Sequence, residues 1–289
     1  MNITIVNACS DLGVMINGSE KGPLVLSQEL NNIDKIITVK KENIEKERDK
    51  GNKKRNIKYV NKFNEELYNK IINEKDFVIT LGGDHSIAIG SDLASKKKYG
   101  NIGLLWIDAH SDYHNMDSTI TGNIHGMPFA TISGQNGNEL SYFFGGEYYN
   151  PKKTVLIGAR DIEDPEYINL EKAGVKIFTT EDIKTLGVEK VMEEAFDIAL
   201  SNTLGVHISY DLDVIDPEIA KGVSVKASDG INEKEAYEIK DEIIKKINIV
   251  KSLDLVEYNP DNDIDNNTKK IALNILNDII NAKKWENLI

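Results

Sequence analysis

The chain has 289 residues, of which 40% are hydrophobic and 28% are charged, and its formal net charge at pH 7 is −12. This negative balance disfavours nucleic acids and anionic membrane surfaces as partners, because both are bound by basic surfaces, and the longest apolar runs are too short to cross a bilayer. The single cysteine, Cys9, excludes an internal disulfide, and residues 1–6 lack the basic flank and long apolar core of a secretory signal. We therefore expect a cytoplasmic protein whose charge is compatible with a cationic substrate.

Strand-like and helix-like segments alternate along the chain. Repeated βα units predict an α/β fold with three layers, α/β/α, in which helices cover both faces of a mostly parallel sheet of about eight strands. No linker rich in Pro, Gly and Ser interrupts the pattern, so residues 1–289 are expected to form a single domain. The expected strands are 1–6, 36–39, 77–81, 102–107, 154–158, 175–178, 204–209 and 249–256, and the expected helices include 57–72, 188–200, 233–247 and 268–281.

A cluster of acids and histidines follows the apolar run at 102–107. Asp108, His110 and Asp112 are spaced i, i+2 and i+4, so an extended backbone directs all three side chains to one face. Two carboxylates and an imidazole packed this closely require a cation or hydrogen-bond donors to compensate them. Taken alone, the same pattern is also compatible with acids that cap a helix or lie in a hydrated loop.

Two further strand ends carry the same kinds of side chain, which favours the metal interpretation. Asp211 and Asp213 end the strand at 204–209, and His85 follows the strand at 77–81 and opens a helix. Ligand sites of open α/β sheets lie at the carboxyl ends of strands. Four carboxylates and two imidazoles are too many ligands for one ion and fit two ions, between which a shared water would supply hydroxide near neutral pH. The oxygen-rich set without thiolate favours Mn²⁺ over Zn²⁺.

Four sequence blocks in this order, GGDHS, DAHSD, TGNIHGMP and SYDLDVIDP, resemble the signature blocks of the arginase or ureohydrolase family. The similarity extends from GSEKGP (residues 18–23) to LDLVEYNP (residues 253–260). It implies an arginase-like fold and a hydrolase that acts on C–N bonds in linear amidines, cleaving L-arginine to L-ornithine and urea. It also implies two Mn²⁺ per subunit and a homotrimer or homohexamer.

The resemblance further assigns roles within these blocks. One ion would be held by His85, Asp108, Asp112 and Asp211, and the other by Asp108, His110, Asp211 and Asp213, so that Asp108 and Asp211 bridge. Glu257 resembles the carboxylate that pairs with the guanidinium, for which its planar shape is suited. His125 resembles a proton-shuttle histidine, and together with Asp213 it is a candidate for passing a proton to the leaving amine. The alternatives are that His125 only caps the following helix and that Glu257 is an ordinary acid at a strand end.

The long polar connection at residues 113–125 corresponds by position to the loop that contacts the amino-acid end of the substrate. Glu163 and Glu166, in the RDIEDPE segment, correspond to acids that hold the α-amino group, although both could be surface acids, and Asp161 and Asp164 leave room for a shift of one residue. The chain departs from the family where His114 replaces Asn, Thr121 replaces Ser and Glu163 replaces Asp. The loop residues expected to contact the substrate are His114, Thr119, Thr121 and Asn123.

Two alternatives remain. A sister ureohydrolase, an agmatinase or a formimidoylglutamase, would use the same metal blocks and differ in the 113–125 loop. A non-catalytic metal-binding protein on the same scaffold would be expected to have lost ligands, whereas all six ligand positions are filled here.

Two other features are expected to be structural. The charge-dense segment at 40–58 favours a solvated loop or the exposed start of a helix over a partner-binding patch. His207 shares a strand face with Asp211 and is expected to be a core histidine, or one that supports the ligands, and not a ligand itself.

Overall fold

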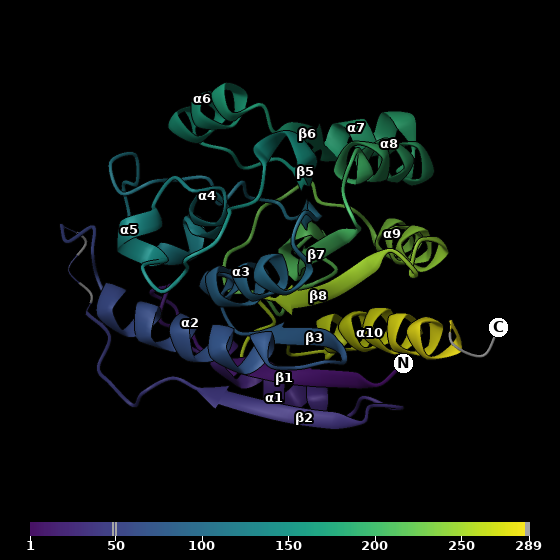
Figure 1. Cartoon of the computed structure of the whole chain (residues 1–289), viewed down its shortest axis with the longest axis horizontal. Coiled ribbons are helices and arrows are strands. Elements are labelled where there is room, and N and C mark those ends of the chain that lie inside the picture. The colour runs from purple at the N-terminus through teal and green to yellow at the C-terminus, as the bar shows by residue number, and fades with distance from the viewer. Residues whose placement is uncertain (48, 50, 287–289) are drawn as a thin grey trace.

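In the part of the chain that the computed structural model describes, residues 1–47, 49 and 51–286, eight strands form one sheet (Figure 1). The strand order is β2-β1-β3-β8-β7-β4-β5-β6, and every neighbouring pair is parallel. The strands are β1 (Ile3–Cys9), β2 (Lys35–Lys40), β3 (Phe77–Gly82), β4 (Gly103–Ile107), β5 (Thr154–Ala159), β6 (Lys176–Thr179), β7 (Val206–Asp211) and β8 (Val250–Val256).

Helices cover both faces of the sheet, because each buried strand presents alternate side chains to opposite sides. In β4, Leu105 and Ile107 pack into one apolar cluster, whereas Leu104 and Trp106 pack into the other. The first cluster is covered by α1 (Gly22–Ser27), α7 (Thr180–Leu186), α8 (Val188–Leu200), α9 (Glu233–Lys245) and α10 (Asn267–Trp285). The second is covered by α2 (Ile57–Ile72), α3 (Ala88–Tyr99), α4 (Pro128–Ile132), α5 (Gly137–Leu140) and α6 (Asp164–Ala173). None of the described helices is long and apolar enough to span a membrane.

The predicted three-layer α/β fold is confirmed, and the sheet is parallel throughout. The largest differences in strand boundaries have local causes. Because Asn7, Ala8 and Cys9 are also buried and paired with β2, β1 continues past the expected 1–6. Leu204 is 67% exposed and Gly205 has a φ of 143°, so β7 begins only at Val206 and ends at the first acid of its motif.

Sheet order brings distant parts of the sequence to one point. β3 and β4 follow one another in the sequence but are not neighbours in the sheet. The two positions between them are occupied by β8 and β7, which come later in the chain. The four adjacent strands β3, β8, β7 and β4 therefore end side by side. Their carboxyl ends lead into His85, Glu257, Asp211 and Asp108, respectively. Such an edge is where open parallel sheets bind ligands.

Most described residues of the charge-dense segment at 40–58 are exposed and lie in a loop that leads into α2, as its composition predicts, but two of its cations are buried. Arg48 and Lys50 lie outside the described residues, but Lys46 and Arg55 are buried, at 8% and 2% exposure. The ammonium of Lys46 donates hydrogen bonds to the carbonyl oxygens of Asp11, Val14 and Ile16 at 3.0–3.1 Å. This cation therefore binds the segment to the loop that follows β1.

Candidate functional site

The turn after β3 delivers His85 to the carboxyl edge of the sheet. Gly83 is required there, because a Cβ atom at this position would lie 1.9 Å from the carbonyl oxygen of Ser10. Asp84 then caps the short 3₁₀ turn at His85–Ile87, accepting the amide of Ser86 at 2.8 Å. The His85 ring stacks on Trp106 with ring centroids 4.1 Å apart, which fixes the plane of the imidazole.

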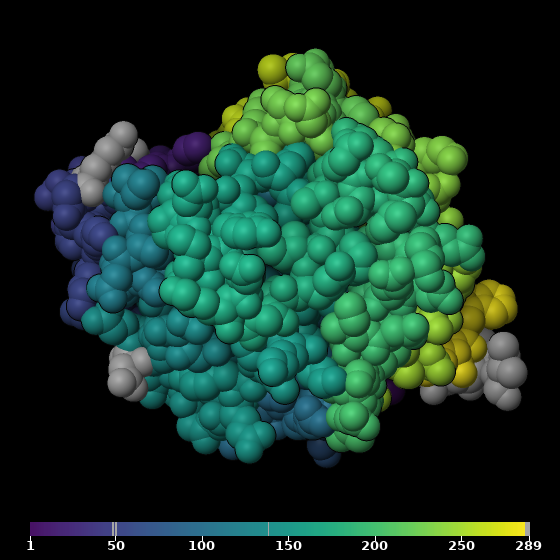
Figure 2. All heavy atoms as spheres, turned by 90° about the horizontal axis from the view of Figure 1, so that it is seen from above, coloured from purple at the N-terminus to yellow at the C-terminus, as the bar shows by residue number. Residues whose placement is uncertain are grey.

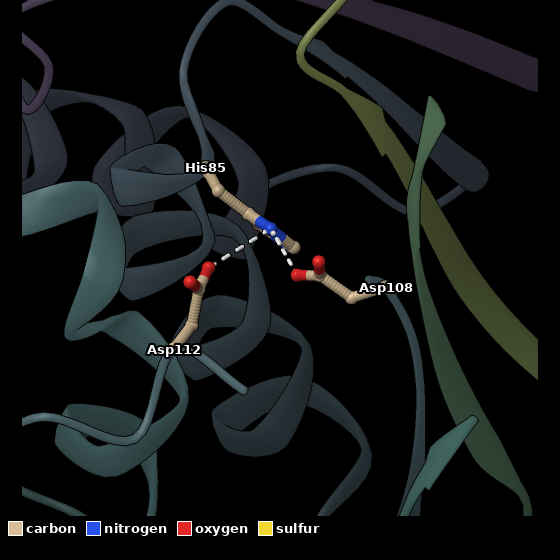
Figure 3. Close-up of side chains that lie close together, drawn as sticks. All are labelled: His85, Asp108 and Asp112. Atoms are coloured by element: carbon tan, nitrogen blue, oxygen red, sulfur yellow. Dashed lines mark ion pairs between the residues drawn. The ribbon is translucent and has the colours of Figure 1, made fainter. Parts of the chain in front are cut away.

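Nδ1 of His85 faces three carboxylates. It lies 3.1 Å from Oδ2 of Asp108, 3.2 Å from Oδ2 of Asp112 and 3.1 Å from Oδ2 of Asp211; Figure 3 shows the ring between the first two. Nδ1 is buried and has no hydrogen-bond partner among the described residues. Nε2 of the same ring lies 2.9 Å from the hydroxyl of Ser209. A proton on Nε2 would be donated to Ser209 and would leave the lone pair of Nδ1 free to bind a metal.

A second acid–imidazole group adjoins the first. Nδ1 of His110 lies 2.9 Å from Oδ2 of Asp213 and 3.6 Å from Oδ1 of Asp108. Asp108 therefore belongs to both groups. Asp211 contacts His85 with Oδ2, while its Oδ1 accepts the amide of Asp213 at 2.8 Å. The six residues expected as metal ligands are thus gathered at one edge of the sheet.

Electrostatics at this edge indicate an excess of negative charge. Burial and the charges of Asp213 and Asp108 raise the pKa of Asp211 well above its usual value, and burial together with Asp108 raises that of Asp112 to about 7. Burial opposes protonation of His85, but Asp108, Asp112 and Asp211 outweigh it and raise the pKa of the imidazole well above its usual value. Groups arranged in this way attract cations.

The donor set and its spacing fit bound divalent ions. An ion that binds its ligands at about 2.1–2.2 Å in octahedral geometry brings neighbouring ligand atoms to about 3 Å from each other. The contacts of Nδ1 of His85 with three acids have this length. Both groups combine one imidazole with carboxylates and contain no thiolate, so either could hold a hard or borderline dication.

A cavity of about 220 Å³ opens over these groups, and Glu257 lines it. Oε1 of Glu257 accepts the amide of His85 at 2.9 Å, whereas the buried Oε2 has no hydrogen-bond partner in the described part of the chain. Glu257 and Asp112 both have left-handed backbones, with φ of 65° and 50°. Such strain in residues other than glycine is typical of functional sites. The free carboxylate oxygen can accept hydrogen bonds from a planar cation.

The substrate-contact residues predicted from the 113–125 loop divide into two groups. The structure places Thr119 away from the cavity lining: it is 2% exposed, and its hydroxyl accepts the amide of Gly122 at 3.0 Å. A substrate contact from Thr119 remains a prediction. The cavity is lined by the other expected residues, His114, Thr121, Asn123, Glu163 and Glu166, and also by His125 and Asp161.

His114 already contacts the two acids predicted to hold an α-amino group. Its Nε2 lies 3.3 Å from Oε2 of Glu163 and 3.5 Å from Oε2 of Glu166. Glu166 is fixed by the start of α6, where its Oε2 accepts the amide of Glu163 at 3.1 Å. Its Oε1 accepts the hydroxyl of Ser111 at 2.6 Å and the amide of Tyr113 at 3.0 Å. Glu163, whose side chain is 45% exposed, is the freer of the two acids.

Two supporting residues were not identified from the sequence. Ser209, which orients His85, lies two positions before Asp211, so the strand period could have indicated it. Arg160 donates to the carbonyl oxygens of Asp213 at 2.7 Å and Val214 at 2.9 Å, and so holds the loop after β7. The Arg160 contact joins residues more than fifty positions apart, and no local sequence pattern indicates it.

A third acid–imidazole group lies outside the cavity lining. His207, expected to be a core or supporting histidine, is 1% exposed, and its Nε2 lies 3.1 Å from Oδ1 of Asp92 and 3.6 Å from Oδ2 of Asp254. Burial opposes its protonation, but the two acids raise the pKa of His207 to about 10. The two acids thus favour the protonated form of His207, and its burial agrees with a core or supporting role.

Comparison with known proteins gives consistent matches. A family model described as the arginase family matches residues 1–281. The arginase of Bacillus subtilis (strain 168) is 35% identical over 296 residues, covering 97% of this chain and 98% of that protein. The structure of Entamoeba histolytica arginase in complex with L-ornithine has a TM-score of 0.89 at 28% identity, covering 96% of this chain and 97% of that one. The Bacillus caldovelox arginase structure has a TM-score of 0.87 at 31% identity, covering 96% and 98%.

Proposed function

Because the chain belongs to the arginase family, we propose that it hydrolyses L-arginine to L-ornithine and urea with two Mn²⁺ per subunit. The observation that carries this proposal is the free Oε2 of Glu257, buried in a cavity beside two acid–imidazole groups. A guanidinium is planar and carries donors only, and this oxygen is an unused acceptor.

We propose the metal ligands that the family resemblance implies. His85, Asp108, Asp112 and Asp211 would hold one ion, and Asp108, His110, Asp211 and Asp213 the other, with Asp108 and Asp211 shared. Support comes from the contacts of Nδ1 of His85 and from the membership of Asp108 in both groups. Manganese is favoured by the excess of oxygen over nitrogen ligands and by the lack of thiolate. Two such ions lower the pKa of a shared water, so that hydroxide is available near neutral pH.

The protein groups around the cavity would orient the substrate and move its protons. Glu257 would hold the guanidinium through Oε2, with its carbon above the acid–imidazole groups. Water adds to this carbon, and the bond to the ε-nitrogen of L-arginine breaks once that nitrogen has gained a proton, which releases it as the δ-amino group of L-ornithine. His125 lines the cavity and hydrogen-bonds Glu257 at 3.1 Å, so it and Asp213 are the groups positioned for this transfer.

The amino-acid end of the substrate would lie toward the loop at 113–125. Thr119, Thr121 and Asn123 are proposed to serve the α-carboxylate, with Thr121 and Asn123 supported by their place in the cavity lining. Glu163 and Glu166 are proposed to serve the α-amino group. His114 would have to yield part of its contact with these acids when an ammonium group binds.

The test is a comparison of substrates on the manganese-loaded protein. We expect kcat/KM for L-arginine to exceed that for agmatine, which lacks the α-carboxylate, by about 10²–10⁴-fold, since two charge-assisted contacts are worth roughly 3–6 kcal/mol. Urea release is measured with L-arginine and with agmatine, and formamide release is measured with formimidoylglutamate. A ratio near one or below would replace the arginine assignment with an agmatinase, and release of formamide alone with a formimidoylglutamase. Tight manganese binding without turnover of any of the three would indicate a non-catalytic metal protein.

The same proposal covers assembly and location. We propose that residues 1–289 form one domain and that the subunits assemble as a homotrimer or homohexamer, which sedimentation of the manganese-loaded protein would measure. A cytoplasmic location is supported by the single cysteine, Cys9, which has no second cysteine in the chain for a disulfide. L-Arginine is the proposed cationic partner, and neither nucleic acid nor membrane is proposed, because the net charge is −12.

A further inference from the structure

Arg55 is a buried cation next to the cavity. It precedes the first turn of α2, is 2% exposed, and forms no ion pair with an acid among the described residues. Its Nη1 donates to the carbonyl oxygen of Asp49 at 3.1 Å, and its Nη2 donates to Oδ1 of Asn123 at 2.6 Å. Both acceptors are neutral. A buried guanidinium without a carboxylate is costly unless an anion reaches its neighbourhood.

The segment that carries Arg55 packs against the 113–125 loop. Nζ of Lys53 donates to the carbonyl oxygen of Asp117 at 2.8 Å, and a Cβ atom on Gly122 would lie 2.9 Å from the carbonyl oxygen of Asn52. At the left of Figure 1 and Figure 2, dark blue residues that precede α2 lie beside teal residues of the middle of the chain. The segment therefore supports the loop whose residues Thr121 and Asn123 line the cavity.

The bond between Arg55 and Asn123 determines which end of the amide remains available. A guanidinium has donors and no acceptor, so Asn123 has to present its oxygen to Arg55. Asn123 lines the cavity, and the described residues provide no hydrogen-bond partner for its Nδ2. The amide is thus held with its two N–H donors free for an anionic ligand.

We propose that Arg55 is a positioning residue that makes the cavity specific for a guanidino substrate with a carboxylate at its far end. It holds Asn123 with the NH₂ group toward that carboxylate, and its unpaired positive charge favours the anion. Arg55 itself does not line the cavity, so it acts through Asn123. This inference rests on the proposed function, because it assumes that L-arginine occupies the cavity.

The experiment uses the manganese-loaded, full-length protein and the variants Arg55→Met and Lys54→Met. Lys54 is the matched control: it removes a cation one position away, is 57% exposed at its side chain, and pairs with Glu139 at the surface. We expect Arg55→Met to raise KM for L-arginine about 10–100-fold, the effect of losing one charge-assisted contact, with kcat within about threefold. kcat/KM for agmatine should stay within about threefold, because agmatine has no carboxylate. Lys54→Met should leave both substrates unchanged.

A double-mutant cycle separates positioning from a general structural effect. If Arg55 acts through Asn123, Arg55→Met should change the ratio of kcat/KM for L-arginine to kcat/KM for agmatine when Asn123 is present. The same substitution should leave this ratio unchanged in the Asn123→Ala background. Equal losses for both substrates, an unchanged ratio, or additive effects in the cycle would overturn the inference.

A second variant keeps the test decisive if Arg55→Met does not fold. Asn123→Asp retains an acceptor for Arg55 but replaces the two donors by a negative oxygen, so it should reduce kcat/KM for L-arginine at least about tenfold and spare agmatine. An unchanged preference in this variant would contradict the inference. If instead the wild-type protein does not prefer L-arginine, the proposed function itself has failed, and the two failures are distinguished before any variant is made.

Discussion

Nδ1 of His125 lies 3.1 Å from Oε1 of Glu257, the same oxygen that accepts the backbone amide of His85. Oε1 is therefore occupied by hydrogen bonds within the protein, and only Oε2 remains for a ligand. Burial alone would lower the pKa of His125, but the hydrogen bond and charge of Glu257 outweigh it and raise the pKa. The residue proposed to hold the guanidinium thus also fixes the imidazole proposed to pass the proton.

Replacement of this histidine should affect turnover and spare the metals. We expect His125→Asn to lower kcat by about 10²–10⁴-fold, the usual contribution of a general acid or base, with manganese content unchanged. Because the pKa of His125 is raised, the protonated form should persist above the usual histidine range, and the wild-type kcat profile should fall on the alkaline side as this proton is lost. Kinetics of the variant that match the wild type at every pH would leave His125 as a residue of the 3₁₀ turn Ile124–Gly126 only.

Asp108 should be essential for both metals. Since it contacts His85 and His110, Asp108→Asn is expected to weaken binding at both positions and to abolish urea release. Metal analysis after gel filtration measures the manganese-to-protein ratio, and Asp197→Asn, at an exposed position on α8, provides the control. Two tightly held manganese ions with full activity in Asp108→Asn would refute the proposed ligand set.

The buried group of Asp92, His207 and Asp254 should make stability depend on pH. Burial and the charge of Asp254 raise the pKa of Asp92 to about 7, above its value in the unfolded chain. A raised carboxyl pKa favours the folded state at low pH, and this benefit is lost as pH rises from about 4 to about 7. The side chain in Asp92→Asn cannot ionise. The free energy of unfolding of this variant should therefore exceed that of the wild type by about 1–3 kcal/mol at pH 8 and by less at pH 5.

Urea unfolding of both proteins at the two pH values, in the same metal state, measures this difference. Asp197→Asn should show no such dependence. A gain of equal size at pH 5 and pH 8 would mean that ionisation of Asp92 is not its cause.

Lys46 should contribute strongly to stability although it lies in a charge-dense segment. It donates to three carbonyl oxygens of the loop after β1 and lies 3.2 Å from Oδ2 of the buried Asp11. Lys46→Met removes the donor of the three carbonyl oxygens and one of the two cations that pair with Asp11, the other being Lys41, and loss of one partner of a buried pair costs up to about 3–5 kcal/mol. Thermal and urea unfolding measure the loss, and Lys62→Met, which removes an exposed lysine of α2 that pairs with Glu42, should change little. Equal effects of the two variants would show that burial of Lys46 does not matter.

The sequence predicts the ligands more completely than their surroundings. Each acid or imidazole of the candidate metal site follows an apolar strand, and parallel strands end at one edge, so His85, Asp108 and Asp211 could be grouped without a structure. Tertiary packing decides the rest. The burial of Arg55 and Lys46 depends on which loops they meet, and the hydroxyl of Thr119 is used within its own loop. The left-handed backbone of Glu257 is likewise imposed by its surroundings, since glycine and asparagine are the residues that adopt this conformation readily.

The order of strands in the sheet also constrains how the protein is made. β3 and β4 are synthesised early but are not neighbours; β7 and β8, which separate them, leave the ribosome near the end of translation. Until then, the inner edges of β3 and β4 have no partner, and unpaired strand edges are where nascent chains associate with one another. Insertion of the last two strands closes these edges and delivers Asp211, Asp213 and Glu257 in the same step. The candidate metal site therefore cannot be complete before β7 and β8 are in place, and we expect a chain that stalls before residue 250 to be aggregation-prone and to lack this site.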